Sequence, residues 1–214
     1  VGAPARYGAY MNSAAFGQSV YLGIHSNAGS GSARGDLGLY NNESLFPNTA
    51  TPNQIAWADL VGHAINDELS AITAPPLAYA WHNSGSSDAA VTYARTDYAF
   101  GEIRSSANGD EFDATIAEVA YHDNATDAAI MEDPDGRSDI ARALYHATVQ
   151  YFAQFGGGSS TYMPDAPTDV RAISNSNASV TLYWTAPKTD ATTGGAGAAT
   201  GYKIYYGNSD YGFS

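Results

Sequence analysis

Two short apolar runs, far apart in the sequence, each contain or directly precede a side chain that can bind a metal or transfer a proton. The first is Val20 to Ile24, which is followed directly by His25, and the second is Ala114 to Ala120, which contains Glu118. Apolar runs of this length, rich in β-branched residues, are typical of strands buried in a sheet. A carboxylate inside such a strand needs a partner or a function, because burying a charge is costly.

Two longer segments have the periodicity of helices. Apolar side chains recur at three- and four-residue intervals over 54–72 and over 138–155. This spacing predicts helices with one apolar face, the first capped by Asn53 and the second ended by Gly156. Strands that alternate with helices predict an α/β domain with a mostly parallel, twisted sheet flanked by helices.

The remaining segments of the first 155 residues are shorter. A helix is expected within 5–16, and further strands are expected at 36–40 and 100–104. The segment 77–97 is rich in Ala, Ser and Tyr without a clear period, and we interpret it as an insertion or a lid-like loop.

The sequence changes character after the second long helix. Its Gly/Ser-rich start gives 156–164 the composition of a flexible linker. Alternating runs beyond it predict strands at 169–173, 179–184 and 201–207. The turn residues between these runs and the Trp of the second run are similar to those of a fibronectin type III module. A complete module of this kind needs about seven strands and about 100 residues, so only part of one is expected here. We therefore expect three parts. They are an α/β domain over 1–155, a linker over 156–164 and a partial, all-β fibronectin-like module over 165–214.

Composition limits the partners of the chain. With 22 Asp+Glu against 9 Lys+Arg, the net charge of -13 excludes nucleic acid as a partner, because it repels phosphate. No apolar run approaches the ~18 residues of a membrane span. The acidic, Gly/Ser/Asn/Tyr-rich composition is typical of a secreted or cell-surface protein. Without cysteine, any metal must be bound by His and carboxylates.

Several motifs together are similar to the zinc-dependent N-acetylmuramoyl-L-alanine amidases of the amidase-3 type. The similarity covers about 5–155, apart from the insertion at 77–97. Near the first strand it lies in Ile24-His25-Ser26-Asn27-Ala28 and the nearby Ala33-Arg34-Gly35. Further along it lies in Glu118 with Asn124, in Asp133-Pro134 and in the long closing helix. The resemblance implies hydrolysis of the amide between the lactyl group of N-acetylmuramic acid and the first L-alanine of a peptidoglycan stem.

The resemblance also implies roles for two residues. His25 matches a zinc ligand and Glu118 matches the catalytic acid/base, whereas Asn124 is expected to shape the turn after its strand. The family places its other His ligand and its Glu ligand before the region matched by Ala5. The amidase-like domain is therefore expected to lack its N-terminal part, which could also be bound as a separate chain. The present chain alone is expected to be inactive.

Other residues and other functions are weaker alternatives. His63, His82 and His146 are expected to be solvated or structural. His122, four residues after Glu118, is a candidate for lining the substrate cleft, and Ser26 has no evident His/Asp relay. Two functional alternatives stay open. One is an inactive amidase-like module that binds wall or glycan, and the other is a structural surface or fibre component.

Overall fold

The structure, a computed structural model, describes residues 2–72, 81, 91–187 and 199–207. The chain divides into two units, Val1–Ser160 and Thr161–Ser214. Most of the expected insertion at 77–97 lies outside the described residues. Within the described ranges, no helix combines the length and the apolar character needed to cross a membrane.

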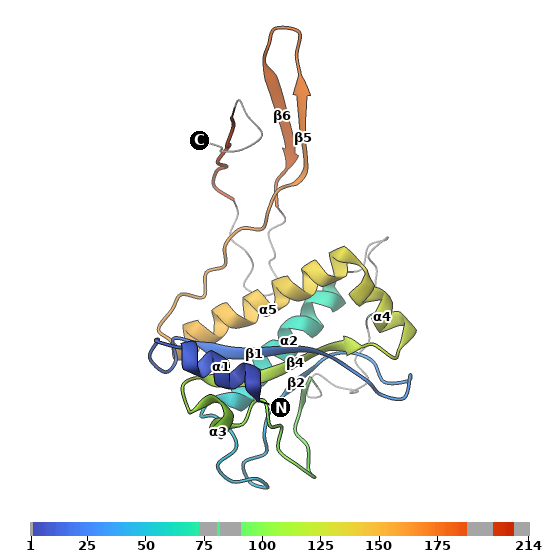
Figure 1. The fold of residues 1–214 in the computed structure, drawn as a ribbon. Coiled ribbons are helices and arrows are strands. Elements are labelled where there is room, and N and C mark those ends of the chain that lie inside the picture. The colour runs from blue at the N-terminus through green and yellow to red at the C-terminus, as the bar shows by residue number, and fades with distance from the viewer. Residues whose placement is uncertain (1, 73–80, 82–90, 188–198, 208–214) are drawn as a thin grey trace. The chain divides into compact units, whose positions relative to one another are not determined.

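The first unit is a mixed α/β structure built around a four-stranded sheet in the order β1-β4-β2-β3 (Figure 1). Pairing is parallel between β1 and β4 and between β2 and β3, and antiparallel between β2 and β4. The predicted α/β class with a mostly parallel sheet is therefore confirmed. In chain order the elements are α1 (Ala3–Met11), β1 (Val20–Asn27), β2 (Leu37–Leu39), α2 (Gln54–Ala71), β3 (Thr92–Tyr93), α3 (Ser105–Asn108), β4 (Asp113–Tyr121), α4 (Ala125–Glu132) and α5 (Pro134–Phe155).

The two long helices, α2 and α5, cover the same face of the sheet (Figure 1). Their apolar stripes are fully or almost fully buried together with Ala117 and Val119 of β4, and comprise Trp57, Val61, Ile65, Leu69, Ile140, Ala143, Leu144, Ala147 and Tyr151. Burial of these stripes supplies most of the stability of such helices. The helix α5 begins at Pro134, earlier than its apolar period indicates, because the Asp133 side chain accepts a hydrogen bond from the Asp135 N–H and caps it.

A glycine lets α2 approach the sheet closely. A Cβ atom at Gly38 of β2 would lie 2.0 Å from the carbonyl oxygen of Ala58 in α2. No side chain fits in this space, so Gly38 sets the distance between helix and sheet.

The predicted strand at 100–104 is wrong, because these residues form turns that lead into α3. Buried side-chain amides take up the backbone groups that a strand would pair. Asn41 bonds both the N–H and the carbonyl oxygen of Phe100, at 2.6 and 3.2 Å. Gln54 Nε2 donates to the carbonyl oxygens of Ile103 and Ala114, each at 2.8 Å.

The second unit contains an antiparallel hairpin of β5 (Thr168–Ser174) and β6 (Val180–Thr185). The third predicted strand, at 201–207, is not formed in the described part of this unit. That run contacts the hairpin through side chains, with the rings of Tyr202 and Trp184 edge to face at 5.0 Å, rather than through a backbone ladder. The fibronectin-like module remains a prediction.

Candidate active site

The two strands singled out in the sequence are neighbours, and their polar residues share one face of the sheet. β1 and β4 run parallel, and His25 is the register partner of Glu118. Side chains alternate along a strand, so Tyr21, Gly23 and His25 point to the face opposite the α2/α5 core. In open α/β sheets, the carboxyl ends of parallel strands are where sites form.

Glu118 is the half-buried member of this pair. Its Oε2 atom is buried and accepts no hydrogen bond from any residue that the structure describes. Burial raises the pKa of the Glu118 carboxyl, an effect that His25 partly offsets and the nearby Glu102 reinforces. A carboxyl with a raised pKa holds its proton closer to neutral pH, as a general acid/base requires.

The structure adds Glu102, which the sequence analysis missed, to the site. The Tyr21 hydroxyl donates to Glu102 Oε1 at 2.7 Å, and both carboxylate oxygens lie 3.3 Å from His25 Nε2. Burial and then the hydrogen bond to Glu102 raise the pKa of Tyr21. The available signal was an acid between the apolar residues Phe100 and Ile103, but the segment 100–104 was predicted as a strand.

A second polar contact lies at the strand ends. Ser26 Oγ and His122 Nδ1 are 3.0 Å apart, and both side chains are exposed. The sequence did not indicate that His122 lies beside Ser26. A serine hydrolase also needs a carboxylate that orients the His. Among the described residues, no carboxylate hydrogen-bonds to His122, so Ser26 and His122 form a pair rather than a triad.

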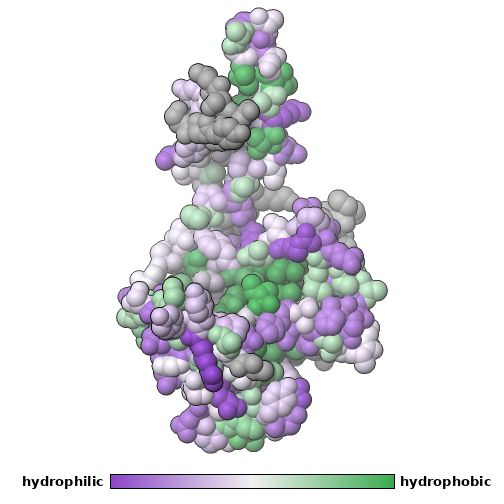
Figure 2. All heavy atoms as spheres, in the orientation of Figure 1, coloured by the Kyte–Doolittle hydropathy of each residue, from purple (hydrophilic) through white to green (hydrophobic). Residues whose placement is uncertain are grey.

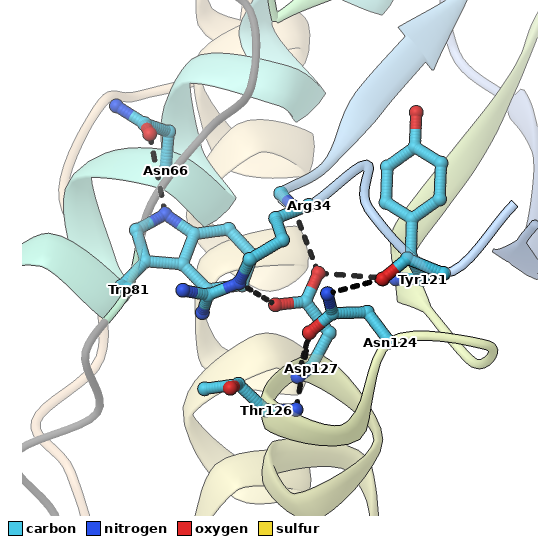
Figure 3. A network of polar contacts seen from close by, with 9 residues as sticks. Arg34, Asn66, Trp81, Tyr121, Asn124, Thr126 and Asp127 are labelled. Carbon is cyan, nitrogen blue, oxygen red and sulfur yellow. Dashed lines mark hydrogen bonds and ion pairs between the residues drawn. The ribbon is translucent and has the colours of Figure 1, made fainter. Parts of the chain in front are cut away.

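Two aspartates after β4 hold the loop that follows β1. Asp123 accepts hydrogen bonds from the N–H groups of Gly29 and Gly31, which lower the pKa of its carboxyl. The buried Asp127 binds the Arg34 Nε at 2.9 Å and accepts from the N–H of Gly35 at 2.8 Å (Figure 3). These contacts fix the loop beside the ends of β1 and β4.

Asn124 occupies the turn between β4 and α4, as expected. Its side chain caps α4 by accepting from the N–H groups of Thr126 and Asp127 (Figure 3). Its amide also donates to the carbonyl oxygen of Gly31 at 3.0 Å. Asn124 therefore joins the turn to the same loop.

The donor set around His25 suits zinc in kind, because imidazole and carboxylate are zinc ligands. Within the described ranges, however, no three His, Cys, Asp or Glu residues are grouped so that they could hold a metal ion. His63 pairs with Asp59 on α2, His146 is buried on α5, and His82 lies outside the described residues. Zinc binding at His25 therefore remains a prediction.

The strand β1 is an edge of the sheet, and its surroundings are partly apolar. Ile24, next to His25, is 62% exposed. Figure 2 shows hydrophobic residues gathered in the middle of the first unit, with a mostly hydrophilic rim in this view. The polar site therefore lies on a strand that also carries an exposed apolar side chain.

Comparisons with known proteins give a likeness in fold. No family model matches the sequence, and no curated protein matches it. Among solved structures, the N-acetylmuramoyl-L-alanine amidase from Clostridium difficile 630 is similar, with a TM-score of 0.50 and 14% identity over 72% of this chain and 66% of that chain. At this identity the likeness is one of fold.

Two further solved structures have the same kind of name. The apo N-acetylmuramyl-L-alanine amidase from Mycobacterium abscessus has a TM-score of 0.41 and 23% identity over 62% of this chain and 54% of that chain. The catalytic domain of the amidase CwlV from Bacillus (Paenibacillus) polymyxa var. colistinus has a TM-score of 0.43 and 18% identity over 63% and 57%. The chain thus spans about half the length of these amidase structures.

Proposed function

We propose that the protein is a zinc-dependent N-acetylmuramoyl-L-alanine amidase. It would hydrolyse the amide between the lactyl group of N-acetylmuramic acid and the first L-alanine of peptidoglycan. The observation that carries this proposal is the register pairing of His25 with the half-buried Glu118 at neighbouring parallel strands. The likeness in fold to a clostridial amidase supports it.

In this proposal His25 binds zinc through its imidazole, and further ligands come from outside the described residues. A carboxylate close to His25 fits the donor types that zinc takes in hydrolases. When bound, zinc would polarise the amide carbonyl and favour deprotonation of the attacking water.

Glu118 is proposed to move the proton. Its carboxylate takes a proton from the water as the new bond from oxygen to the carbonyl carbon forms. It then gives that proton to the alanine nitrogen as the carbon–nitrogen bond breaks, which yields a free lactyl carboxylate and a free amine. The raised pKa of Glu118 suits both halves of this transfer, because the group must accept and release a proton near neutral pH.

The substrate places the proposed reaction at the cell wall, outside the cytoplasm. Peptidoglycan is the proposed partner, and the net charge of -13 is unfavourable for nucleic acid. The loop held by Asp123 and Asp127 lies beside the ends of β1 and β4, where the glycopeptide would bind.

Exchange of Glu118 for Gln in the full-length protein tests the proposal. Glu118→Gln keeps the shape of the side chain but removes the proton acceptor, so we expect the turnover of a muramoyl-peptide substrate to fall by about 10²–10⁴-fold. Zinc content and melting temperature should remain those of the parent. Glu132→Gln removes the same charge from an exposed position at the end of α4 and is the matched control. Undiminished turnover in Glu118→Gln would remove the proposed role.

A further inference from the structure

A β-bulge interrupts the pairing of β1 and β4 directly after the candidate site. On β1 the pairing advances by two residues, from His25 to Asn27, 27 less 25. On β4 it advances by three residues, from Glu118 to Tyr121, 121 less 118. The ladder then resumes, because the N–H of His122 donates to the carbonyl oxygen of Asn27 at 2.9 Å. Bulges redirect side chains and are frequent beside active sites, and this one sets the place of His122.

The imidazole of His122 is held at one ring nitrogen. Its Nδ1 atom lies 3.0 Å from the Oγ atom of Ser26 on β1, and both side chains are exposed. Within the part of the chain that the structure describes, no other group hydrogen-bonds to this ring. Because Ser26 occupies Nδ1, Nε2 is the ring nitrogen that is available to a ligand.

His122 also lies close to the carboxyl that is proposed to transfer the proton. Burial raises the pKa of the Glu118 carboxyl, and the nearby charges of His25 and His122 oppose this shift. A substrate bound for attack beside Glu118 is therefore near the His122 imidazole.

The described site is rich in hydrogen-bond acceptors. Glu102, Glu118 and Asp123 all contribute carboxyl groups. A peptide substrate presents carbonyl oxygens, which need N–H or O–H donors rather than further acceptors. His25 is already proposed for zinc, so the His122 ring is an N–H donor that the proposed mechanism leaves unused.

We propose that His122 binds the peptide of the substrate by donating a hydrogen bond from Nε2 to a carbonyl oxygen, which rests on the proposed function. Ser26 is then a positioning residue. Its hydroxyl donates to Nδ1 and so keeps the hydrogen of the neutral ring on Nε2. The pair of Ser26 and His122 thus has a role in binding that needs no third member.

Ligand affinity in the full-length protein tests this role, with Glu118→Gln as the background so that the ligand is not cleaved. The ligand is N-acetylmuramoyl-L-alanyl-D-isoglutamine, and its affinity is measured by calorimetric titration. We expect His122→Phe to weaken binding by about 2- to 10-fold, because one hydrogen bond is lost. His122→Gln keeps an N–H donor and should recover part of this loss. His63→Phe, on α2 where His63 pairs with Asp59, is the matched control and should leave the affinity unchanged.

Nuclear magnetic resonance of protein labelled with ¹⁵N-histidine gives a second readout, which a purely structural role would not change. At about pH 8, where imidazole is ordinarily neutral, long-range ¹H–¹⁵N spectra identify the ring nitrogen that carries the hydrogen. We expect it on Nε2 of His122, and we expect the Nε2 resonance to shift when the ligand binds. Ser26→Ala should give a mixture of the two tautomers.

The outcomes separate this inference from the proposed function. If the Glu118→Gln protein binds the ligand, and His122→Phe has no effect or the Nε2 resonance does not shift, the inference is overturned and the proposed function stands. A hydrogen on Nδ1 also overturns the inference, since Nε2 would then be an acceptor. A Glu118→Gln protein that binds no ligand overturns the proposed function and the inference with it. Far-ultraviolet circular dichroism identifies a variant that has failed to fold, and if His122→Phe fails, the Nε2 resonance of the unsubstituted His122 decides.

Discussion

His25 and Glu118 are register partners on neighbouring parallel strands, β1 and β4. The pairing brings together residues 93 positions apart in sequence, 118 less 25, and turns both to the same face of the sheet. That face is opposite the core of α2 and α5, so the pair is free of the packing demands of the helices. The remaining features of the fold secure these two strands and the turn beside them.

The close approach of α2 to β2 should not tolerate a side chain at Gly38. The added methyl of Gly38→Ala would meet the Ala58 carbonyl oxygen at 2.0 Å, so helix and strand must move apart. We expect a loss of about 3 kcal/mol in the free energy of unfolding, measured by urea denaturation. Gly8→Ala in α1 is the control, because the added Cβ would lie 3.5 Å from the Phe112 ring, an ordinary van der Waals distance. A parent-like midpoint for Gly38→Ala would contradict the observed approach.

The buried Asp127 should be essential for the loop after β1. Asp127→Asn removes the charge that pairs with Arg34 and weakens acceptance from the Gly35 N–H. We expect a loss of about 3 kcal/mol in unfolding free energy, because a buried charge partner is removed. Asp67→Asn, at an exposed position of α2, should change stability by less than about 0.5 kcal/mol. Equal stabilities for the two variants would show that Asp127 has no such role.

Acid should loosen the same loop through Asp123. The N–H groups of Gly29 and Gly31 stabilise the ionised carboxyl and lower its pKa. Because the folded pKa lies below the unfolded value of about 3.9, the contribution is present above that value and is lost as pH falls through the folded pKa. We expect faster amide hydrogen exchange at Gly29 and Gly31 on acidification, relative to the intrinsic rate. Asp123→Asn should abolish this pH dependence of exchange. If the pH dependence persists in Asp123→Asn, a group other than Asp123 causes it.

The long helices were predictable because their signals are local. Trp57, Val61, Ile65 and Leu69 recur at helical spacing, and the structure buries all of them. The strand β4 was equally clear from its apolar run. The turn around Glu102 was not, because the groups that replace strand pairing there come from Asn41 and Gln54, distant in sequence.

The site was predictable in part for the same reason. His25 and Glu118 stand out individually, as polar residues in or after apolar strands. Glu102 becomes relevant only through Tyr21 and Gly23, since its carboxylate reaches β1 across the fold. The alternation of Tyr21, Gly23 and His25 is visible in the sequence, but it does not indicate which side chain fills the space above the glycine.

Gln54 should be as important for this turn as the turn's own residues. Gln54→Leu would remove the partner of the Asn41 N–H and of the carbonyl oxygens of Ile103 and Ala114. We expect a cost of at least about 2 kcal/mol in unfolding free energy, because buried polar groups lose their hydrogen bonds. Thermal unfolding followed by circular dichroism measures it, with the exposed Gln154→Leu in α5 as control. If both variants melt alike, the turn does not depend on Gln54.

Product analysis of digested peptidoglycan tests the central claim most directly. Purified sacculi are incubated with the full-length, zinc-loaded protein, and the soluble and insoluble products are identified by mass spectrometry. The account predicts stem peptides with a free N-terminal L-alanine and glycan strands that keep the lactyl group of muramic acid, with neither formed by Glu118→Gln. Intact sacculi, or cleavage at any other bond, would contradict it.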